Sequence, residues 1–215
     1  MREYLTMTKI SKTKRGNWKA RRNRDYFANQ APLAGYRSRA AWKLLEIDKK
    51  DSLIDKNGVT IDLGAAPGSW SQIVGEKIKD EGIVIAVDVL QMEPLANVTF
   101  IRGDFMDINI QADILEAVKY RKVDLVLSDM APNLTGVRDF DQMRSIELAK
   151  AARDFALKCL SPRGRLLVKL FDGTETVNFQ QETKRLFERC LVRKPTASRP
   201  ESAEFFLIAC NPRHA

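Results

Sequence analysis

The sequence predicts an α/β fold with a mostly parallel seven-stranded sheet, an antiparallel last strand and helices on both faces. Short apolar, β-branched runs recur along the chain, and stretches with helical periodicity separate most of them. The first apolar run also ends in a glycine-rich turn, as in α/β folds that bind nucleotides. Since 215 residues suffice to bury one core, we expect a single domain over residues 31–215.

The first elements of this domain surround the glycine-rich turn. Residues 38–49 are expected to form a helix, because Ser38 can cap it and apolar residues recur along one side. The apolar run 59–63 is typical of a buried strand. After the turn, Ser69 can cap a helix that runs to about residue 79. These elements form a strand, a loop and a helix.

The middle of the chain continues the alternation. Residues 83–87, 98–101 and 123–128 are apolar runs of strand length, and residues 106–120 between the last two have helical periodicity. We expect the run 123–128 to be a buried strand in the centre of the sheet, ending on Asp129.

The last part of the chain completes the sheet. A long helix is expected to stop at Ser161-Pro162-Arg163-Gly164, because proline and glycine end helices. A short edge strand and the final strand then form a closing hairpin, which makes the final strand antiparallel. The expected elements are a helix at 141–160, a strand at 165–168, a helix at 178–189 and strands at 191–193 and 205–210.

The glycine-rich turn Gly64-Ala65-Ala66-Pro67-Gly68 indicates the kind of ligand. Its glycine spacing differs from the Gly-x-Gly-x-x-Gly pattern of dinucleotide sites, and no Gly-Lys-Ser/Thr follows to hold a triphosphate. The loop is small and uncharged, and it suits a ligand that contains adenosine and lacks a polyphosphate. S-adenosylmethionine (SAM) fits this description best.

The net charge of +8 is concentrated at the N-terminus, where residues 1–24 hold nine Lys or Arg and one acidic residue. Such a block can be a solubilising tail. The aromatic residues Trp18, Tyr26 and Phe27 favour a nucleic-acid-binding arm over residues 1–30, whose charges neutralise phosphates and whose rings stack on bases. We therefore prefer nucleic acid as the partner.

Other residue types narrow the function. The only histidine is His214, so triads that use histidine and histidine metal sites are excluded, and no metal is expected. The cysteines Cys159, Cys190 and Cys210 are odd in number and lie in apolar contexts, which is typical of reduced buried thiols. Without a membrane-spanning run or a signal-peptide pattern, a cytoplasmic protein is expected.

Charged residues at the strand ends predict an active site. Asp88, Asp104, Asp129 and Lys169 each end a parallel strand, and Glu204 begins the antiparallel one, so all should reach the same edge of the sheet. A charge at a single strand end is usually only solvated, but the set as a whole indicates a site beside the glycine-rich turn. Asp88 is expected to accept from the ribose hydroxyls of SAM and Asp104 from its adenine amino group.

Several motifs carry a resemblance to a known family. They are Tyr36-Arg37-Ser38-Arg39-Ala40-Ala41-Trp42-Lys43-Leu44, the turn from Asp62 to Gln72, Leu127-Ser128-Asp129-Met130-Ala131-Pro132-Asn133 and Val168-Lys169-Leu170-Phe171. From about Tyr26 to Cys210 the chain resembles the RrmJ (FtsJ) ribosomal RNA large-subunit ribose 2'-O-methyltransferases. This resemblance implies a Rossmann-like, SAM-dependent methyltransferase fold.

The resemblance also implies the site residues and the substrate. The family's catalytic tetrad falls on Lys43, Asp129, Lys169 and Glu204, although Lys43 lies on the polar flank of its helix, where a lysine is usually solvated. Here Ser202-Ala203-Glu204 departs from the usual Ser-Arg-Glu, and Glu201 is a nearby competitor for the Glu204 role. The implied substrate is a uridine in the A-loop of 23S rRNA within the assembled large subunit, and a monomer is expected. The implied SAM contacts are Gly68, Trp70, Asp88, Asp104 and Asp129.

The implied chemistry assigns a role to each member of the tetrad. A ribose 2'-hydroxyl is a weak acid, so the transfer needs a base near the oxygen, and a lysine can act as that base only when neutral. Lys169 is the expected base and Lys43 orients the hydroxyl or stabilises its developing charge, while Asp129 and Glu204 position the lysines and the methyl donor. Trp70 could equally be a core indole.

Other functions stay open at this point. A base methyltransferase is disfavoured, because Asp129-Met130-Ala131-Pro132 lacks the aromatic residue that grips a flipped base and the cysteines lie away from the predicted edge. A tRNA 2'-O-methyltransferase would share the tetrad. A non-catalytic RNA-binding ribosome-assembly factor would retain only the fold and the arm.

Overall fold

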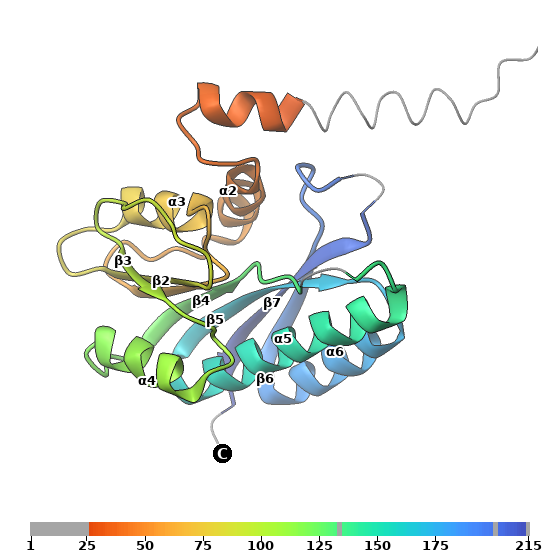
Figure 1. Ribbon diagram of the computed structural model, residues 1–215. Coiled ribbons are helices and arrows are strands. Elements are labelled where there is room, and N and C mark those ends of the chain that lie inside the picture. The colour runs from red at the N-terminus through yellow and green to blue at the C-terminus, as the bar shows by residue number, and fades with distance from the viewer. Residues whose placement is uncertain (1–25, 133–134, 200–201, 214–215) are drawn as a thin grey trace, which may run out of the picture.

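The computed structural model describes residues 26–132, 135–199 and 202–213. Within these residues, a sheet of seven strands lies between helices on both faces (Figure 1). The strands are β1 (Val59–Leu63), β2 (Ile83–Asp88), β3 (Thr99–Arg102), β4 (Val123–Ser128), β5 (Leu160–Phe171), β6 (Phe187–Arg193) and β7 (Glu204–Pro212). The helices that cover the sheet are α2 (Ala40–Asp51), α3 (Ser69–Lys77), α4 (Ile108–Ala117), α5 (Arg138–Cys159) and α6 (Thr174–Leu186).

The strand order is β3-β2-β1-β4-β5-β7-β6. Neighbouring strands pair in parallel, except that β7 runs antiparallel to both β5 and β6. This topology confirms the predicted α/β fold with its antiparallel last strand. It also brings the carboxyl ends of β1 to β5 and the start of β7 to the same edge of the sheet.

Some predicted boundaries are wrong by several residues. Helix α5 ends at Cys159, as the Pro-Gly stop predicted, but β5 already begins at Leu160, which pairs with Val123 across an irregular step in the ladder. Helix α6 begins at Thr174 instead of residue 178, because the Thr176 hydroxyl donates to the carbonyl oxygen of Phe171 and holds the first turn close to the end of β5.

The predicted cap at Ser69 is wrong, and Ser38 lies one residue before the cap of α2, although its hydroxyl accepts from the amide of Ala40 at 3.2 Å. The cap of α2 is Arg39 and that of α3 is Gly68, which has a left-handed φ of 104°. The hydroxyls of Ser38 and Ser69 instead hydrogen-bond to each other at 2.7 Å. These serines therefore join the approach to α2 to the start of α3.

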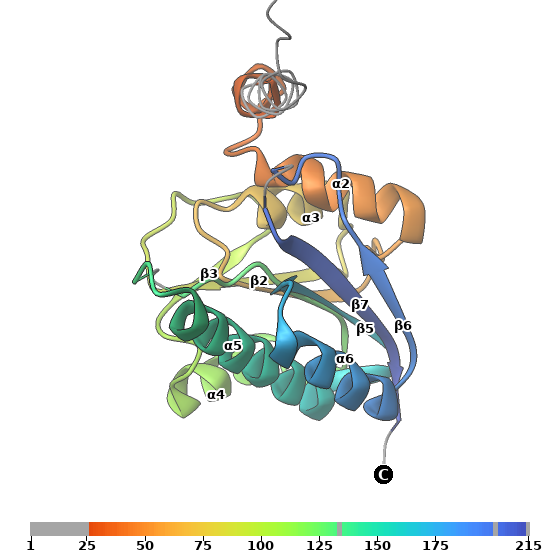
Figure 2. The same cartoon turned by 90° about the vertical axis from the view of Figure 1, so that its right-hand side faces the viewer.

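The two faces of the sheet are covered differently. Helices α2 and α3 lie on one face, and α4, α5 and α6 lie on the other (Figures 1 and 2). The α4–α6 face buries a large apolar cluster that includes Phe155, Phe179 and Leu207, whereas the α2/α3 face buries Leu44, Ile73 and Phe206. Burying one such side chain contributes roughly 1.5 to 3 kcal/mol, so both layers stabilise the sheet.

The predicted basic arm falls mostly outside the described residues, including Trp18. Its described end begins a helix over residues 26–33. The ring of Phe27 lies 6.4 Å from that of Trp42 on α2, while Tyr26 is 58% exposed. Phe27 thus packs within the protein, and Tyr26 is the more accessible ring for stacking on a base.

Every helix in the described part of the chain is too short or too polar to cross a membrane.

Candidate active site

The carboxyl edge of the sheet brings Lys169 and Asp129 together. Lys169 lies near the end of β5 and Asp129 follows β4, the strand beside it. The Nζ atom of Lys169 lies 2.9 Å from Oδ1 of Asp129 and also donates to the main-chain carbonyl oxygen of Asp129. Both contacts fix the ammonium at the edge of the sheet.

Lys43 and Glu204 form another ion pair at this edge. Nζ of Lys43 lies 2.7 Å from Oε1 of Glu204, the first residue of β7. The ammonium of Lys43 also lies 5.5 Å from the ring centre of Phe206, which is the register partner of Lys169 on β5. The structure therefore brings the four predicted tetrad residues to this edge as two ion pairs, and the roles of the four residues stay a prediction.

These charges are largely withdrawn from water. Lys43 and Lys169 are each 8% exposed and Glu204 is 9% exposed. The expectation that Lys43 lies on a solvated helix flank is therefore wrong, since its side chain faces the sheet edge. Removing one partner of a buried ion pair leaves an uncompensated charge and typically costs about 3 to 5 kcal/mol, so each lysine is held in place by its carboxylate.

The loop between β6 and β7 completes the Glu204 environment. The Ser198 hydroxyl donates to the same Oε1 atom of Glu204 at 2.9 Å. The loop is fixed to α2 by the guanidinium of Arg39, which donates to the Ala197 carbonyl oxygen, and by Glu46, which accepts from the Thr196 amide and hydroxyl. Lys43 and Ser198 thus reach Glu204 from two segments that are joined to each other.

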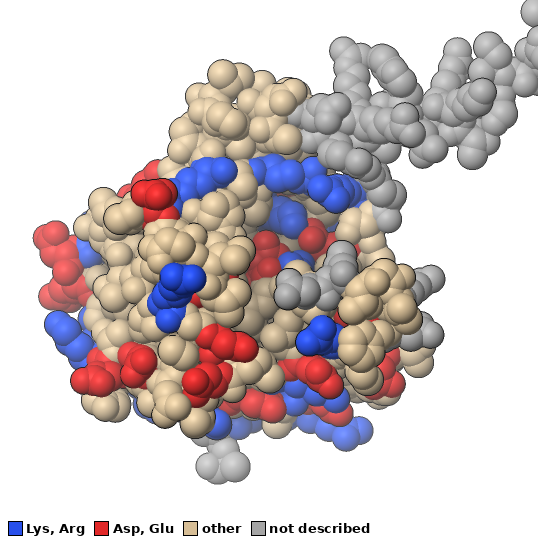
Figure 3. All heavy atoms as spheres, viewed as in Figure 1, with Lys and Arg blue, Asp and Glu red and all other residues tan. Residues whose placement is uncertain are grey.

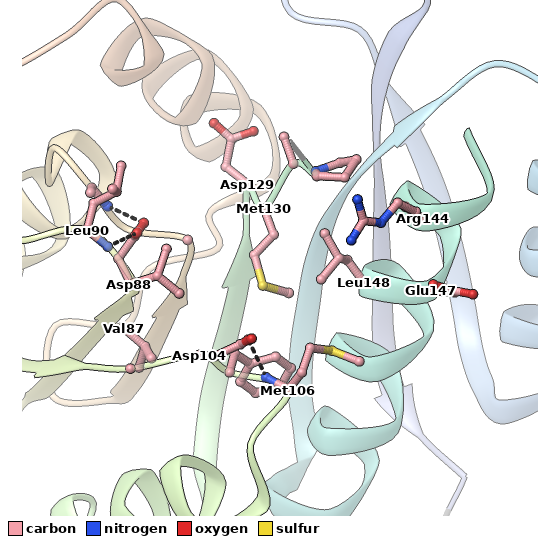
Figure 4. A pocket seen from close by; sticks show the side chains of 17 residues that line it. Val87, Asp88, Leu90, Asp104, Met106, Asp129, Met130, Arg144, Glu147 and Leu148 are labelled. Carbon is pink, nitrogen blue, oxygen red and sulfur yellow. Dashed lines mark hydrogen bonds between the residues drawn. The ribbon is translucent and has the colours of Figure 1, made fainter. Parts of the chain in front are cut away.

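A cavity of about 700 Å³ opens beside these pairs. Figure 4 shows Asp88 and Asp104 on one side of it, Arg144, Glu147 and Leu148 of α5 on the other, and Met130 between them. On the face seen in Figure 3 the surface is hollowed, with acidic side chains inside the hollow and Lys and Arg side chains along its upper rim. The lining residues that matter for a ligand are Gly64, Ala66, Asp88, Asp104, Phe105, Asp129 and Met130.

Main-chain amides orient the carboxylates in the cavity. Asp88 accepts from the amides of Ala66 at 2.9 Å and Leu90 at 2.8 Å, and Asp104 accepts from that of Met106 at 2.9 Å (Figure 4). Each carboxylate oxygen can accept more than one hydrogen bond, so both side chains can still accept from a ligand.

A family model described as FtsJ-like methyltransferase matches residues 36–211, which include every residue of the site. The chain belongs to the FtsJ-like methyltransferase family. A similar protein of Nitrosospira multiformis, named "Ribosomal RNA large subunit methyltransferase E", is 43% identical over 209 residues, which cover 97% of this chain and 100% of the relative.

One similar solved structure supports membership of this family, and a second one shares the fold. A crystal structure of a Plasmodium falciparum protein described as a ribosomal RNA methyltransferase has a TM-score of 0.73 and 31% identity, and the match covers 82% of this chain and 98% of that one. A Streptococcus mutans methyltransferase solved with S-adenosylhomocysteine (SAH) shares the fold at 20% identity, with a TM-score of 0.50 and coverage of 76% and 93%.

FtsJ-like methyltransferases use SAM, and the cavity fits this molecule. Asp88 and Asp104 present carboxylate acceptors for hydroxyl and amino groups, and Phe105, Met130 and Leu148 supply apolar surface for an adenine ring. Gly64 has a positive φ of 75°, and a Cβ there would lie 2.8 Å from Cγ of Met130. Glycine is therefore required at position 64, because a side chain there would strain the backbone and collide with Met130.

The predicted contacts Gly68 and Trp70 are not among the residues that line the cavity. Trp70 is 3% exposed, its Nε1 donates to the carbonyl oxygen of Ala40 at 2.8 Å, and its ring lies 5.7 Å from that of Phe206. Its side chain is thus part of the core, which was the alternative interpretation. A contact of SAM with the main chain at either residue stays a prediction.

Sequence reasoning missed Asp62 of β1. This carboxyl is 1% exposed, and its Oδ2 atom accepts from the Ser71 hydroxyl at 2.6 Å. Burial raises the pKa of Asp62 to about 7, and the charges of Asp129 and Asp88 act in the same direction. The only signal in the sequence was a charged residue within an apolar strand. This signal does not show that Ser71 of α3 is the hydrogen-bond partner of Asp62.

The cysteines are poorly placed for nucleophilic catalysis. Burial raises the pKa of Cys159 to about 12 and also raises the pKa of Cys210. Cys159 ends α5 and Cys210 is near the end of β7, so both lie away from the edge that holds the tetrad. Among the described residues, no group of three or more His, Cys, Asp and Glu could hold a metal ion.

Proposed function

We propose that this methyltransferase transfers the methyl group of SAM to the ribose 2'-hydroxyl of a uridine in the A-loop of 23S rRNA, within the assembled large ribosomal subunit. The observation that supports this most strongly is the pair of buried lysines, each held by a carboxylate, because one of these carboxylates, Asp129, also lines the cavity. A hydroxyl acceptor needs such groups to remove its proton and to stabilise the developing charge.

The cofactor would lie in the cavity between β2, β3 and α5. Asp88 would accept from its ribose hydroxyls and Asp104 from its adenine amino group, because their carboxylates are oriented there by main-chain amides. Bound SAM supplies an electrophilic methyl group on a sulfonium. Asp129 lines the same cavity and also holds Lys169, so this residue links the cofactor site to the acceptor site.

We assign the acceptor side to the lysines. Lys169 takes the proton of the 2'-hydroxyl as its neutral amine, and Lys43 orients the hydroxyl and stabilises the charge on the oxygen. Asp129 and Glu204 hold the two side chains in position. Because the pairs are buried, a hydroxyl in a regular duplex cannot easily reach them, and we expect a nucleotide that is splayed out of a loop.

The residues around the site disfavour methylation of a base. The segment after β4 reads Asp129-Met130-Ala131-Pro132, which has no aromatic ring to stack on a flipped base. The buried thiols do not lie at this edge, so they cannot attack a pyrimidine carbon. RNA is favoured over DNA, since only RNA carries the 2'-hydroxyl.

The names of similar proteins support the large-subunit substrate. The Nitrosospira relative is named for the large subunit and is aligned along its whole length with this chain. We therefore place the target in large-subunit rRNA, in preference to tRNA.

The test is methyl transfer from tritiated SAM to purified large subunits, free rRNA and tRNA, all from a strain that lacks the enzyme. Nuclease and alkaline digestion follow, because a 2'-O-methylated ribose yields an alkali-resistant dinucleotide. The proposal predicts resistant label in large subunits. Label in tRNA would identify a tRNA enzyme, alkali-sensitive label would indicate base methylation, and no transfer to any RNA would favour a non-catalytic assembly factor.

A further inference from the structure

The segment that leads into α2 is joined to the cofactor side of the molecule by Arg37. Nη1 of Arg37 donates to the carbonyl oxygens of Pro67 at 2.9 Å and Glu93 at 2.7 Å, and Nη2 donates to that of Pro94 at 2.8 Å. Pro67 belongs to the glycine-rich turn, and Glu93 and Pro94 belong to the loop that follows Asp88. A single guanidinium thus holds two loops next to the cavity.

Other hydrogen bonds join the same segments. Gln72 of α3 donates to the carbonyl oxygen of Gly35 at 2.8 Å and accepts from the amide of Arg37 at 3.3 Å. The hydroxyls of Ser38 and Ser69 are 2.7 Å apart. Residues 35–38 are therefore attached to the turn and to the first turns of α3 at several points.

Gly68 shows how closely Arg37 fits the turn. A Cβ on Gly68 would lie 2.8 Å from Nη1 of Arg37 and 2.6 Å from the sulfur of Met92. Gly68 also has a φ of 104°, which side chains rarely adopt. Glycine at this position is explained by the packing of Arg37 and Met92, without any contact to a ligand.

We infer that Arg37 is a positioning residue that couples the cofactor loops to Lys43. This inference rests on the proposed function for the role of Lys43. Lys43 is the fourth residue of α2, which begins at Ala40, two positions after Ser38, and Ala66 beside Pro67 donates to Asp88 in the cavity. Through these contacts, a shift of the turn is transmitted to the helix that carries the acceptor lysine.

The geometry requires a guanidinium. Its planar group directs several N–H donors outward in a fixed arrangement, so it can reach carbonyls on both loops at once. An ammonium is a compact charge on a flexible stem and cannot bridge the same set. Arg37→Lys keeps the charge and most of the side-chain length, and it therefore tests the bridge itself.

The experiment measures SAH binding by calorimetry and the single-turnover rate of methyl transfer to large subunits at saturating SAM. For Arg37→Lys we expect SAH to bind about tenfold more weakly, and the rate at saturating SAM to fall about tenfold as well. A role limited to the cofactor loops would weaken SAH binding but leave that rate unchanged. Arg102→Lys is the matched control, because Arg102 donates to the Val89 carbonyl oxygen of the same loop region without reaching α2.

Gln72→Met supplies an independent variant, because Gln72 bridges the same segments from α3. Gln72→Met should also lower the rate at saturating SAM. This variant keeps the inference testable if Arg37→Lys does not fold. Wild-type SAH affinity and a wild-type rate in either folded variant would overturn the coupling. SAH binding needs no RNA, so failure of the proposed RNA substrate would be seen separately, as absence of transfer by the wild-type enzyme.

Discussion

The two faces of the sheet bury different kinds of side chain. The α4–α6 face is mainly apolar, with Phe155, Phe179 and Phe187 at most 2% exposed, and its buried Arg153 lies over the Phe179 ring and pairs with Glu182. The α2/α3 face also buries apolar residues, but charged side chains, among them Lys43, Asp62 and Lys169, are buried on it as well. The α4–α6 layer therefore mainly supports the sheet, while the α2/α3 layer holds the groups that do chemistry.

The difference follows from the strand register. Side chains alternate between the faces, so Val168 and Leu170 enter the α4–α6 layer while Lys169 between them faces α2 and α3. Buried charges destabilise a protein unless they are paired, and the α2/α3 face pairs them at the edge next to the cavity. Substitutions on the two faces should therefore affect different measurements.

Lys169→Met should have the largest effect on activity. Loss of the proposed base is expected to lower the single-turnover rate of methyl transfer by roughly 10³-fold, within the usual range for general base catalysis. Lys158→Met is the control, because Lys158 is an exposed lysine on α5. A near-wild-type rate for Lys169→Met with normal SAM binding would show that Lys169 is not the base.

Phe179→Ala tests the apolar face. Removing this fully buried ring from α6 should lower the free energy of unfolding by about 3 kcal/mol, as measured by urea denaturation, and leave the affinity for SAH unchanged. Val177→Ala on the same helix is the control, since Val177 is 53% exposed and should cost much less. A loss of SAH binding in folded Phe179→Ala protein would contradict the division between the faces.

Asp62→Asn should change how stability depends on pH. The pKa of Asp62 is raised to about 7 in the folded protein from an ordinary value of 3.8, so between these pH values the folded state holds a proton that the unfolded state has lost. Stability should therefore fall as pH rises through this range, by roughly 2 to 3 kcal/mol between pH 5 and pH 8. Urea denaturation at both pH values should show this loss in the wild type but not in Asp62→Asn.

The matched control for this prediction is Asp55→Asn, because Asp55 is exposed. It should retain the wild-type pH dependence. Equal slopes in the wild type and in Asp62→Asn would mean that Asp62 is ionised in the folded protein.

Ser198→Ala should have the smallest of these effects. Without its hydroxyl, Glu204 loses one of the two donors to Oε1 and holds Lys43 less firmly, so we expect the single-turnover rate to fall about tenfold, the equivalent of about 1.4 kcal/mol. Thr196→Val in the same loop is the control, because Thr196 contacts Glu46 instead. A larger loss in Thr196→Val would mean that docking of the loop matters more than the contact with Glu204.

The sequence was sufficient for the fold and for the convergence of the charged residues. Apolar runs separated by helical periodicity predicted a parallel sheet, and this topology alone brings Asp129, Lys169 and Glu204 to one edge. The family resemblance was needed to add Lys43, because its position on a helix says nothing about its partner. The burial of Lys43 follows from packing on Phe206, which is 163 positions later in the sequence.

The remaining features depend on contacts between distant segments. Ser38 and Ser69 suit helix caps locally, but each is closer to the other than to a free amide. Trp70 lies beside the glycine-rich turn in sequence, yet its side chain points into the core because Ala40 accepts its N–H. The Ser71 partner of Asp62 and the carbonyl partners of Arg37 are likewise set by tertiary structure.

The paired lysines of the α2/α3 face are proposed to activate a ribose hydroxyl, which then takes the methyl group of SAM. Tandem mass spectrometry of nucleosides from large subunits treated with wild-type enzyme or Lys169→Met tests this proposal most directly, because fragmentation separates ribose from base. We expect a methylated ribose with an unmodified uracil for the wild type, and no methylated ribose for the variant. A methyl group on the base fragment, or equal products from both enzymes, would contradict it.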